Sequence, residues 1–88
     1  MDRPKLTESE FAETVDATIQ AFRTKLDGKG WHISVSPHEI LGLTSEEFHE
    51  FAAAVHDNNH TQMKSELEDI AVACLLGIAS INSRKMDW

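Results

Sequence analysis

Two pairs of acidic residues share the same spacing and carry the strongest chemical signal in this sequence. Glu47 and Glu50 are three residues apart, and so are Glu66 and Asp69. Residues at this spacing lie one turn apart on the same face of an α-helix. If the two segments are helices that pack antiparallel across the short turn between them, the four carboxylates meet around one point.

Four carboxylates that meet in this way need a counter-charge. Mutual repulsion and loss of hydration raise the pKa of such groups and penalise their ionised forms. A hard divalent cation removes the penalty, because Mg²⁺ binds carboxylate oxygens, keeps several waters and bridges to phosphate groups. The pattern therefore predicts a Mg²⁺ site, with Mn²⁺ as a substitute, whose ligands are Glu47, Glu50, Glu66 and Asp69. The alternative is a solvated acidic surface, which is the role expected of Glu68.

The first two helices are predicted from the spacing of apolar residues, and the second carries the first acidic pair. Apolar residues recur every three or four positions over residues 11–26, and this periodicity predicts a first helix over about 8–27. The sequence predicts a second helix over about 37–57, which carries Glu47 and Glu50. A break near Gly42, with a separate helix starting at Thr44, is the alternative.

A third helix is predicted to follow Asn59 as its N-cap and to carry the second acidic pair. From Ile70 to Ile81 this segment is apolar on nearly all sides. A helix of that kind lies in a large core or in a subunit interface. A chain of 88 residues is too short to surround it. We therefore expect an all-α fold of three helices with short loops, which assembles into a helical bundle as a homo-oligomer.

Length and composition indicate one domain over residues 1–88, without nucleic acid or membrane as a partner. The net charge is -7 and no basic stripe is present, which disfavours binding to a phosphate backbone. The longest apolar run is shorter than the roughly 20 residues that a membrane span needs. The N-terminus is polar and does not resemble a signal peptide. The single cysteine, Cys74, allows no intramolecular disulfide. A cytoplasmic location is expected.

The acidic pairs and their surroundings resemble the MazG-like all-α nucleoside triphosphate pyrophosphohydrolases. The family pattern Glu-x-x-Glu followed by Glu-x-x-Asp reads here as EFHE at 47–50 and ELED at 66–69. The stretches EEFHEFAAAV and SELEDIAVACLLGIASI are similar to the family's EEvgElaeAi and eElaDvliyllrlA, and the resemblance covers about residues 20–81. It implies a bundle that forms dimers or tetramers. It also implies Mg²⁺-dependent hydrolysis of a (deoxy)nucleoside triphosphate to the monophosphate and pyrophosphate.

The resemblance further implies roles for single residues. Glu47 and Glu50 would be catalytic as well as metal-binding. Trp31 is similar in placement to a family Trp; its expected structural role is to cap the open end of the bundle, and its functional role would be to stack on a nucleobase. Many family members carry further basic and Asn residues after the last metal-binding helix, whereas here only NSRKMDW follows. Arg84 and Lys85 are therefore the candidates for holding substrate phosphates. This departure leaves a degenerate, inactive family member open as an alternative.

The sequence also contains parts of two other kinds of metal site. Glu46-x-x-His49 resembles half of a di-iron carboxylate site; the last helix has no second copy of that motif, but a symmetric dimer could supply it, so a di-iron site is an alternative. His56 and His60 are four apart, but the residues between them break the helix, so a histidine site is not expected. Glu46 is also the candidate for an additional acid in the Mg²⁺ site.

The basic residues Arg23, Lys25 and Lys29 near the end of the first helix could reach phosphate, but exposed surface is their expected role.

The last helix also allows a function other than the one that the resemblance implies. The apolar last helix would also suit a non-enzymatic module that binds another protein. Such a module predicts a heteromeric partner and no Mg²⁺ dependence, whereas the hydrolase predicts pyrophosphate release and a homo-oligomer.

Overall fold

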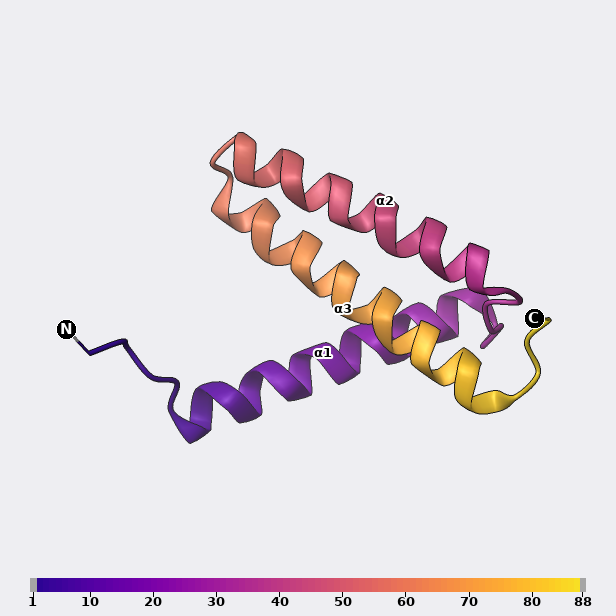
Figure 1. The fold of residues 1–88 in the computed structure, drawn as a ribbon. Helices are drawn as coiled ribbons and strands as arrows, with labels where there is room; N and C mark the ends of the chain where they lie inside the picture. The colour runs from indigo at the N-terminus through magenta and orange to yellow at the C-terminus, as the bar shows by residue number, and fades with distance from the viewer. Residues whose placement is uncertain (1, 88) are drawn as a thin grey trace.

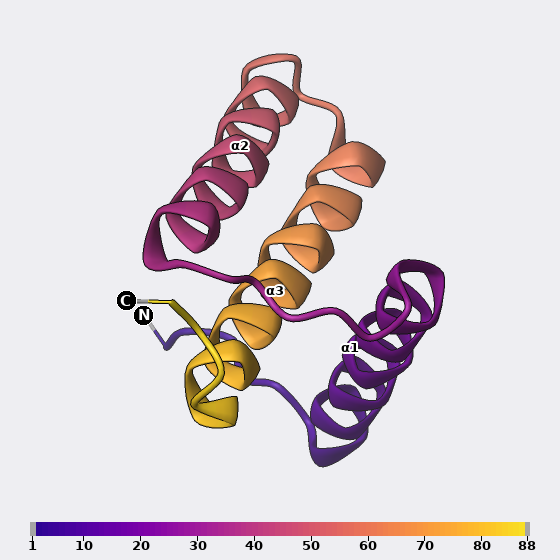
Figure 2. The same cartoon turned by 90° about the vertical axis from the view of Figure 1, so that its right-hand side faces the viewer.

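Three α-helices joined by short loops make up the computed structural model, which describes residues 2–87. The helices are α1 (Glu8–Lys29), α2 (Pro37–His56) and α3 (His60–Ser83). α2 and α3 run antiparallel, and α1 crosses α3 on the opposite side (Figure 1 and Figure 2). α3 is the central helix because it packs on both others, while α1 and α2 do not pack on each other within residues 2–87. The predicted all-α fold of three helices is confirmed.

Side-chain caps explain where each helix begins. Thr7 and Glu10 form a capping box at α1: the Glu10 N–H donates to Thr7 Oγ1 at 3.0 Å, and the Thr7 N–H donates to Glu10 Oε1 at 2.8 Å. Ser36 caps α2 and Asn59 caps α3, each by accepting from the N–H of the residue three positions later. The short polar residues before each helix therefore set its first turn.

The prediction of one helix over about 37–57 is confirmed, and the first helix differs from its prediction only at its end. α2 is continuous through Gly42, so the alternative break and separate start at Thr44 are wrong. The Thr44 hydroxyl instead donates to the Ile40 carbonyl at 2.9 Å, as it does in a helix interior. α1 continues past Gly28 and ends at Gly30, whose φ of 71° is the left-handed conformation that glycine adopts readily. The predicted end of the first helix is therefore two residues too early.

The core is small and lies along α3. The buried apolar side chains are Ala54, Val72, Leu76 and Met86. Gly77 lets α2 and α3 approach closely, because a Cβ atom at this position would lie 3.0 Å from Ile40 Cγ2. A larger residue at position 77 would push α2 away from α3. The close approach of the two helices is what brings their acidic faces together.

The loop between α1 and α2 is held against α3 by buried hydrogen bonds. The Ser34 N–H donates to Ser80 Oγ at 2.9 Å, and the Ser80 hydroxyl donates to the Leu76 carbonyl at 2.7 Å. The Asp87 N–H donates to the Val35 carbonyl at 2.7 Å. The segment after α3 therefore turns back over this loop and covers that end of the molecule.

Much apolar surface stays exposed on the single chain. Phe11 and Ile19 of α1 are 58% and 54% exposed, and Ile78 of α3 is 56% exposed. The radius of gyration is 15.0 Å, against about 12 Å for a compact chain of this length. The accessible surface of 7086 Å² exceeds the compact value of roughly 5,200 Å² by about 1,900 Å². Part of this excess belongs to the extended segment before α1 (Figure 1). No helix within residues 2–87 has the length and apolar character to cross a membrane.

Candidate metal centre

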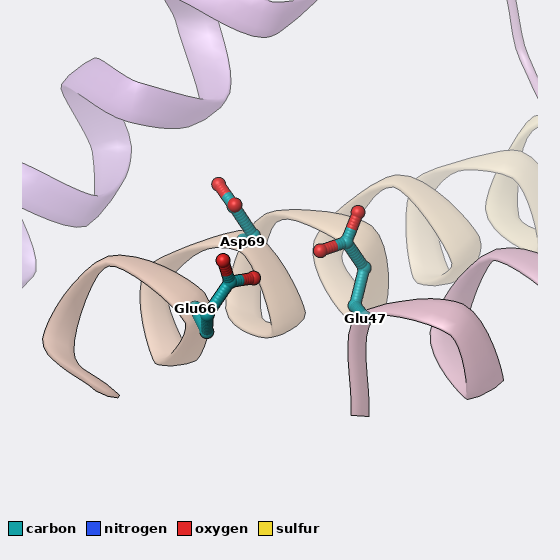
Figure 3. A group of neighbouring side chains, drawn as sticks. All are labelled: Glu47, Glu66 and Asp69. Carbon is teal, nitrogen blue, oxygen red and sulfur yellow. The ribbon is translucent and has the colours of Figure 1, made fainter. Parts of the chain in front are cut away.

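The antiparallel pairing of α2 and α3 brings acidic side chains from both helices together, as predicted. Glu47 from α2 faces Glu66 and Asp69 from α3 (Figure 3). One oxygen atom from each of the three carboxylates lies within 4.8 Å of the other two. This spacing allows a single small cation to contact all three groups.

A short turn makes this pairing possible. After α2, Asn58 adopts a left-handed φ of 53°, which Asn tolerates better than most residues. The Asn58 N–H donates to the Val55 carbonyl at 3.0 Å, and the Asn59 N–H donates to the Ala54 carbonyl at 3.1 Å. Asn59 then caps α3, so the chain reverses direction within a few residues. The two acidic pairs therefore lie opposite each other across the hairpin.

Glu66 is the most deeply placed acid of the cluster. Its side chain is 7% exposed, and Gln62, one turn earlier on α3, donates from Nε2 to Glu66 Oε1. Glu66 Oε2 and Glu47 Oε2 are both buried without a hydrogen-bond partner among the described residues. A buried ionised oxygen without a donor or a cation is costly. The unpaired oxygens are therefore the feature of the cluster that a bound cation would satisfy.

The charges of the cluster shift the pKa values of two glutamates. Loss of hydration raises the pKa of Glu47, the negative charges of Asp69 and Glu66 raise it further, and the positive charge of Lys25 partly opposes them. The pKa of Glu50 is also raised, first by the nearby carboxyl group of Glu66 and then by the charge of Glu47. Metal-free, the site therefore retains protons more readily than ordinary surface acids do.

The four predicted ligands do not occupy equal positions. Glu47, Glu66 and Asp69 form the group that could hold a cation, while Glu50 is exposed and joins the cluster through Glu66. Glu46 is exposed, and its charge has only a minor effect on the pKa values of Glu47 and Glu50. The structure therefore favours three direct ligands and one glutamate at the rim.

Glu68 lies outside the acidic cluster, as expected, but it is less exposed than a fully solvated side chain. Its side chain is only partly exposed and lines grooves between α1 and α3. The sequence pattern of α3 alone could not show this, because α1 covers α3 beside Glu68. Gln62 was missed as a partner of Glu66, although its position four residues earlier on the same helix is a usable signal for such a contact.

None of the three candidate substrate residues belongs to the acidic cluster. Trp31 is 55% exposed; its indole Nε1 donates to Asp27 Oδ1 at 2.8 Å, and the Arg23 guanidinium lies 5.6 Å from the ring centroid. Arg84 is the left-handed C-cap of α3, about 22 Å beyond Asp69 at the rise of an α-helix. Lys85 follows it and is exposed. Their role in substrate binding stays a prediction.

The described residues of one chain form neither of the two other metal sites, and a di-iron site shared between two chains stays an alternative. Within residues 2–87, the carboxylates of Glu47, Glu66 and Asp69 are the one group of three or more potential metal ligands that lie close together. No histidine belongs to it.

No protein-family model, curated protein or solved structure in the comparisons matches this chain. The chemistry of the site therefore has to be judged from the geometry of its own residues.

Proposed function

We propose that this protein is a Mg²⁺-dependent hydrolase that cleaves a (deoxy)nucleoside triphosphate to the monophosphate and pyrophosphate. The observation that carries the proposal is the buried, unpaired Oε2 of Glu66 beside the carboxylates of Glu47 and Asp69. These are hard oxygen donors of the kind that Mg²⁺ and Mn²⁺ prefer. Cleavage between the α- and β-phosphates rests on the resemblance of EFHE and ELED to the MazG-like family.

The residues divide the work between holding the ion and moving a proton. Glu47, Glu66 and Asp69 would hold Mg²⁺, which when bound neutralises charge on the phosphate oxygens. Glu50 at the rim has a raised pKa and can accept the proton of the attacking water. The water oxygen bonds to the α-phosphorus, the bond from that phosphorus to the bridging oxygen breaks, and pyrophosphate leaves.

The test is a panel of ribo- and deoxyribonucleoside triphosphates incubated with the protein and Mg²⁺ or Mn²⁺. We expect pyrophosphate release that Glu66→Gln abolishes. Glu13→Gln makes the same chemical change at an exposed position of α1 and should leave release unchanged. Orthophosphate without pyrophosphate would contradict the proposed cleavage position. No release of either product from any nucleotide would favour the non-enzymatic interaction module or an inactive family member.

We also propose that the chain forms a homo-oligomer, a dimer or a tetramer. The excess surface of about 1,900 Å² lies in the range that one subunit of an obligate dimer buries. The exposed apolar side chains on α1 and α3, Phe11, Ile19 and Ile78 among them, supply the chemistry for such an interface. Multi-angle light scattering should give a multiple of 9.9 kDa. A stable monomer at micromolar concentration would contradict the proposal.

A further inference from the structure

A groove between α1 and α3 opens beside the acidic cluster. Lys25, Gly28 and Lys29 of α1 line one wall, and Glu68, Asp69 and Val72 of α3 line the other. The groove encloses about 500 Å³, which is in the range of small-molecule binding sites. Asp69 belongs both to this groove and to the acidic cluster, so the two are continuous.

The wall that α1 contributes is both cationic and open. Lys25 and Lys29 are one turn apart, so their side chains leave the same face of α1. Between them, a Cβ atom added to Gly28 would meet nothing within 4 Å, so the floor of the groove has free space there. α1 passes the cluster on the side toward which Asp69 points (Figure 3). Two ammonium groups therefore border a space that begins at a metal-ligand candidate.

This arrangement of charge fits one class of ligand better than others. The chain has 8 basic residues against 15 acidic ones, and two of the basic residues stand beside the acidic cluster. A simple anion would be repelled by the carboxylates, and a simple cation would gain nothing from the lysines. A polyphosphate that carries a divalent cation matches both parts, because the cation meets the carboxylates and the remaining phosphate oxygens meet the ammonium groups.

We propose that Lys25 and Lys29 form a subsite for the β- and γ-phosphates of the nucleotide, the part that leaves as pyrophosphate. This inference rests on the proposed function, because it assumes that a divalent cation in the acidic cluster carries the phosphates. It changes the role expected for these lysines from exposed surface to ligand binding.

The test uses inorganic pyrophosphate as the probe, titrated calorimetrically into the full chain in Mg²⁺. We expect binding to the wild type, and about tenfold or greater loss of affinity in the Lys25→Ala/Lys29→Ala double variant, because charge-assisted hydrogen bonds are lost. Lys64→Ala, which removes an exposed lysine from the other groove between α1 and α3, should bind pyrophosphate normally. Equal affinity of the wild type and the double variant, or an equal loss in Lys64→Ala, would overturn the subsite.

Two further readouts separate the subsite from folding and from hydrolysis. The rise in melting temperature caused by Mg²⁺ alone should persist in the double variant, because its metal ligands are intact; its loss would show that the lysines act on the metal site instead. Nucleotide hydrolysis with an unchanged KM in the double variant would refute the subsite and leave the proposed function standing. Lysine-dependent pyrophosphate binding without hydrolysis of any nucleotide would support the subsite and contradict the proposed hydrolysis.

Discussion

Glu47→Gln tests whether repulsion between the carboxylates of the acidic cluster destabilises the metal-free protein. Glu47 is the ligand candidate from α2, and its carboxylate faces those of Glu66 and Asp69 within 4.8 Å. The variant removes one negative charge while keeping the shape of the side chain. The new amide can also donate to Glu66 Oε2, which has no donor among the described residues.

The magnitude follows from the spacing of the charges. Two unit charges 4.8 Å apart repel by about 0.9 kcal/mol at the dielectric constant of water and about 3.5 kcal/mol at an effective value of 20. Solvent screening of the partly exposed Glu47, its partial protonation and the lost attraction to Lys25 all reduce the gain. We therefore expect the free energy of unfolding to rise by ~1 kcal/mol at pH 7, which raises Tm by roughly 4–8 °C in a domain of this size.

The pH dependence has a definite sign. The folded pKa of Glu47 is raised above its unfolded value, so the repulsion is a penalty that is full above the folded pKa. The penalty fades as pH falls through the folded pKa and then the unfolded one. The wild type should therefore approach the melting temperature of Glu47→Gln as the pH is lowered from 7 to 4.

The assay is thermal melting followed by circular dichroism, in chelator-treated buffer and then with millimolar Mg²⁺. Mg²⁺ should stabilise the wild type because it binds the folded cluster, and it should stabilise the variant much less. Glu13→Gln, at an exposed position of α1, should change neither melt. If Glu47→Gln melts no higher than Glu13→Gln in chelator at pH 7, the carboxylates do not repel one another and the reasoning about the site fails.

Three further predictions concern the ligands and the packing around them. Asp69→Asn should remove most of the Mg²⁺-induced rise in Tm while leaving helix content unchanged, as measured by circular dichroism with and without chelator. Mg²⁺ affinity, followed by calorimetry, should fall on acidification at a higher pH than for ordinary carboxylates, because the pKa of the ligand Glu47 is raised and the ligands must be deprotonated. Ser80→Ala should lower the free energy of unfolding by about 1–3 kcal/mol in denaturant melts, because it leaves the buried Ser34 N–H without its acceptor; an unchanged midpoint would contradict that account.

The features that the sequence could predict are those set by local rules. The helices follow from apolar periodicity and from the caps Thr7, Ser36 and Asn59, each of which acts within three residues. The meeting of the acidic pairs follows from their spacing and from the short turn between α2 and α3. These are relations between neighbours in the chain, and helix geometry fixes them before any packing is known.

The features that the sequence could not predict depend on how α1 crosses α3. The environment of Glu68 and the groove beside Lys25 exist only because α1 lies on that side of α3. Trp31 is hydrogen-bonded to Asp27. Asp27 follows Lys25 by two residues, so the two side chains leave α1 about 200° apart. Placing Trp31 relative to the acids therefore needed the rotation of α1 about its axis. Helix spacing places Glu50 with the other three acids, but it does not show which carboxylate oxygens come close enough to share a cation.

The contacts of α3 divide the molecule into two parts that differ in cooperativity. α2 and α3 are consecutive in the chain and form a hairpin, which contains Glu47, Glu50, Glu66 and Asp69. α1 packs only on α3 among the described helices, and it brings the two lysines. Segments held by few contacts open at lower free energy than the rest of a fold. The carboxylate half of the site therefore persists through fluctuations that release α1, and the lysine half is present only while α1 is docked.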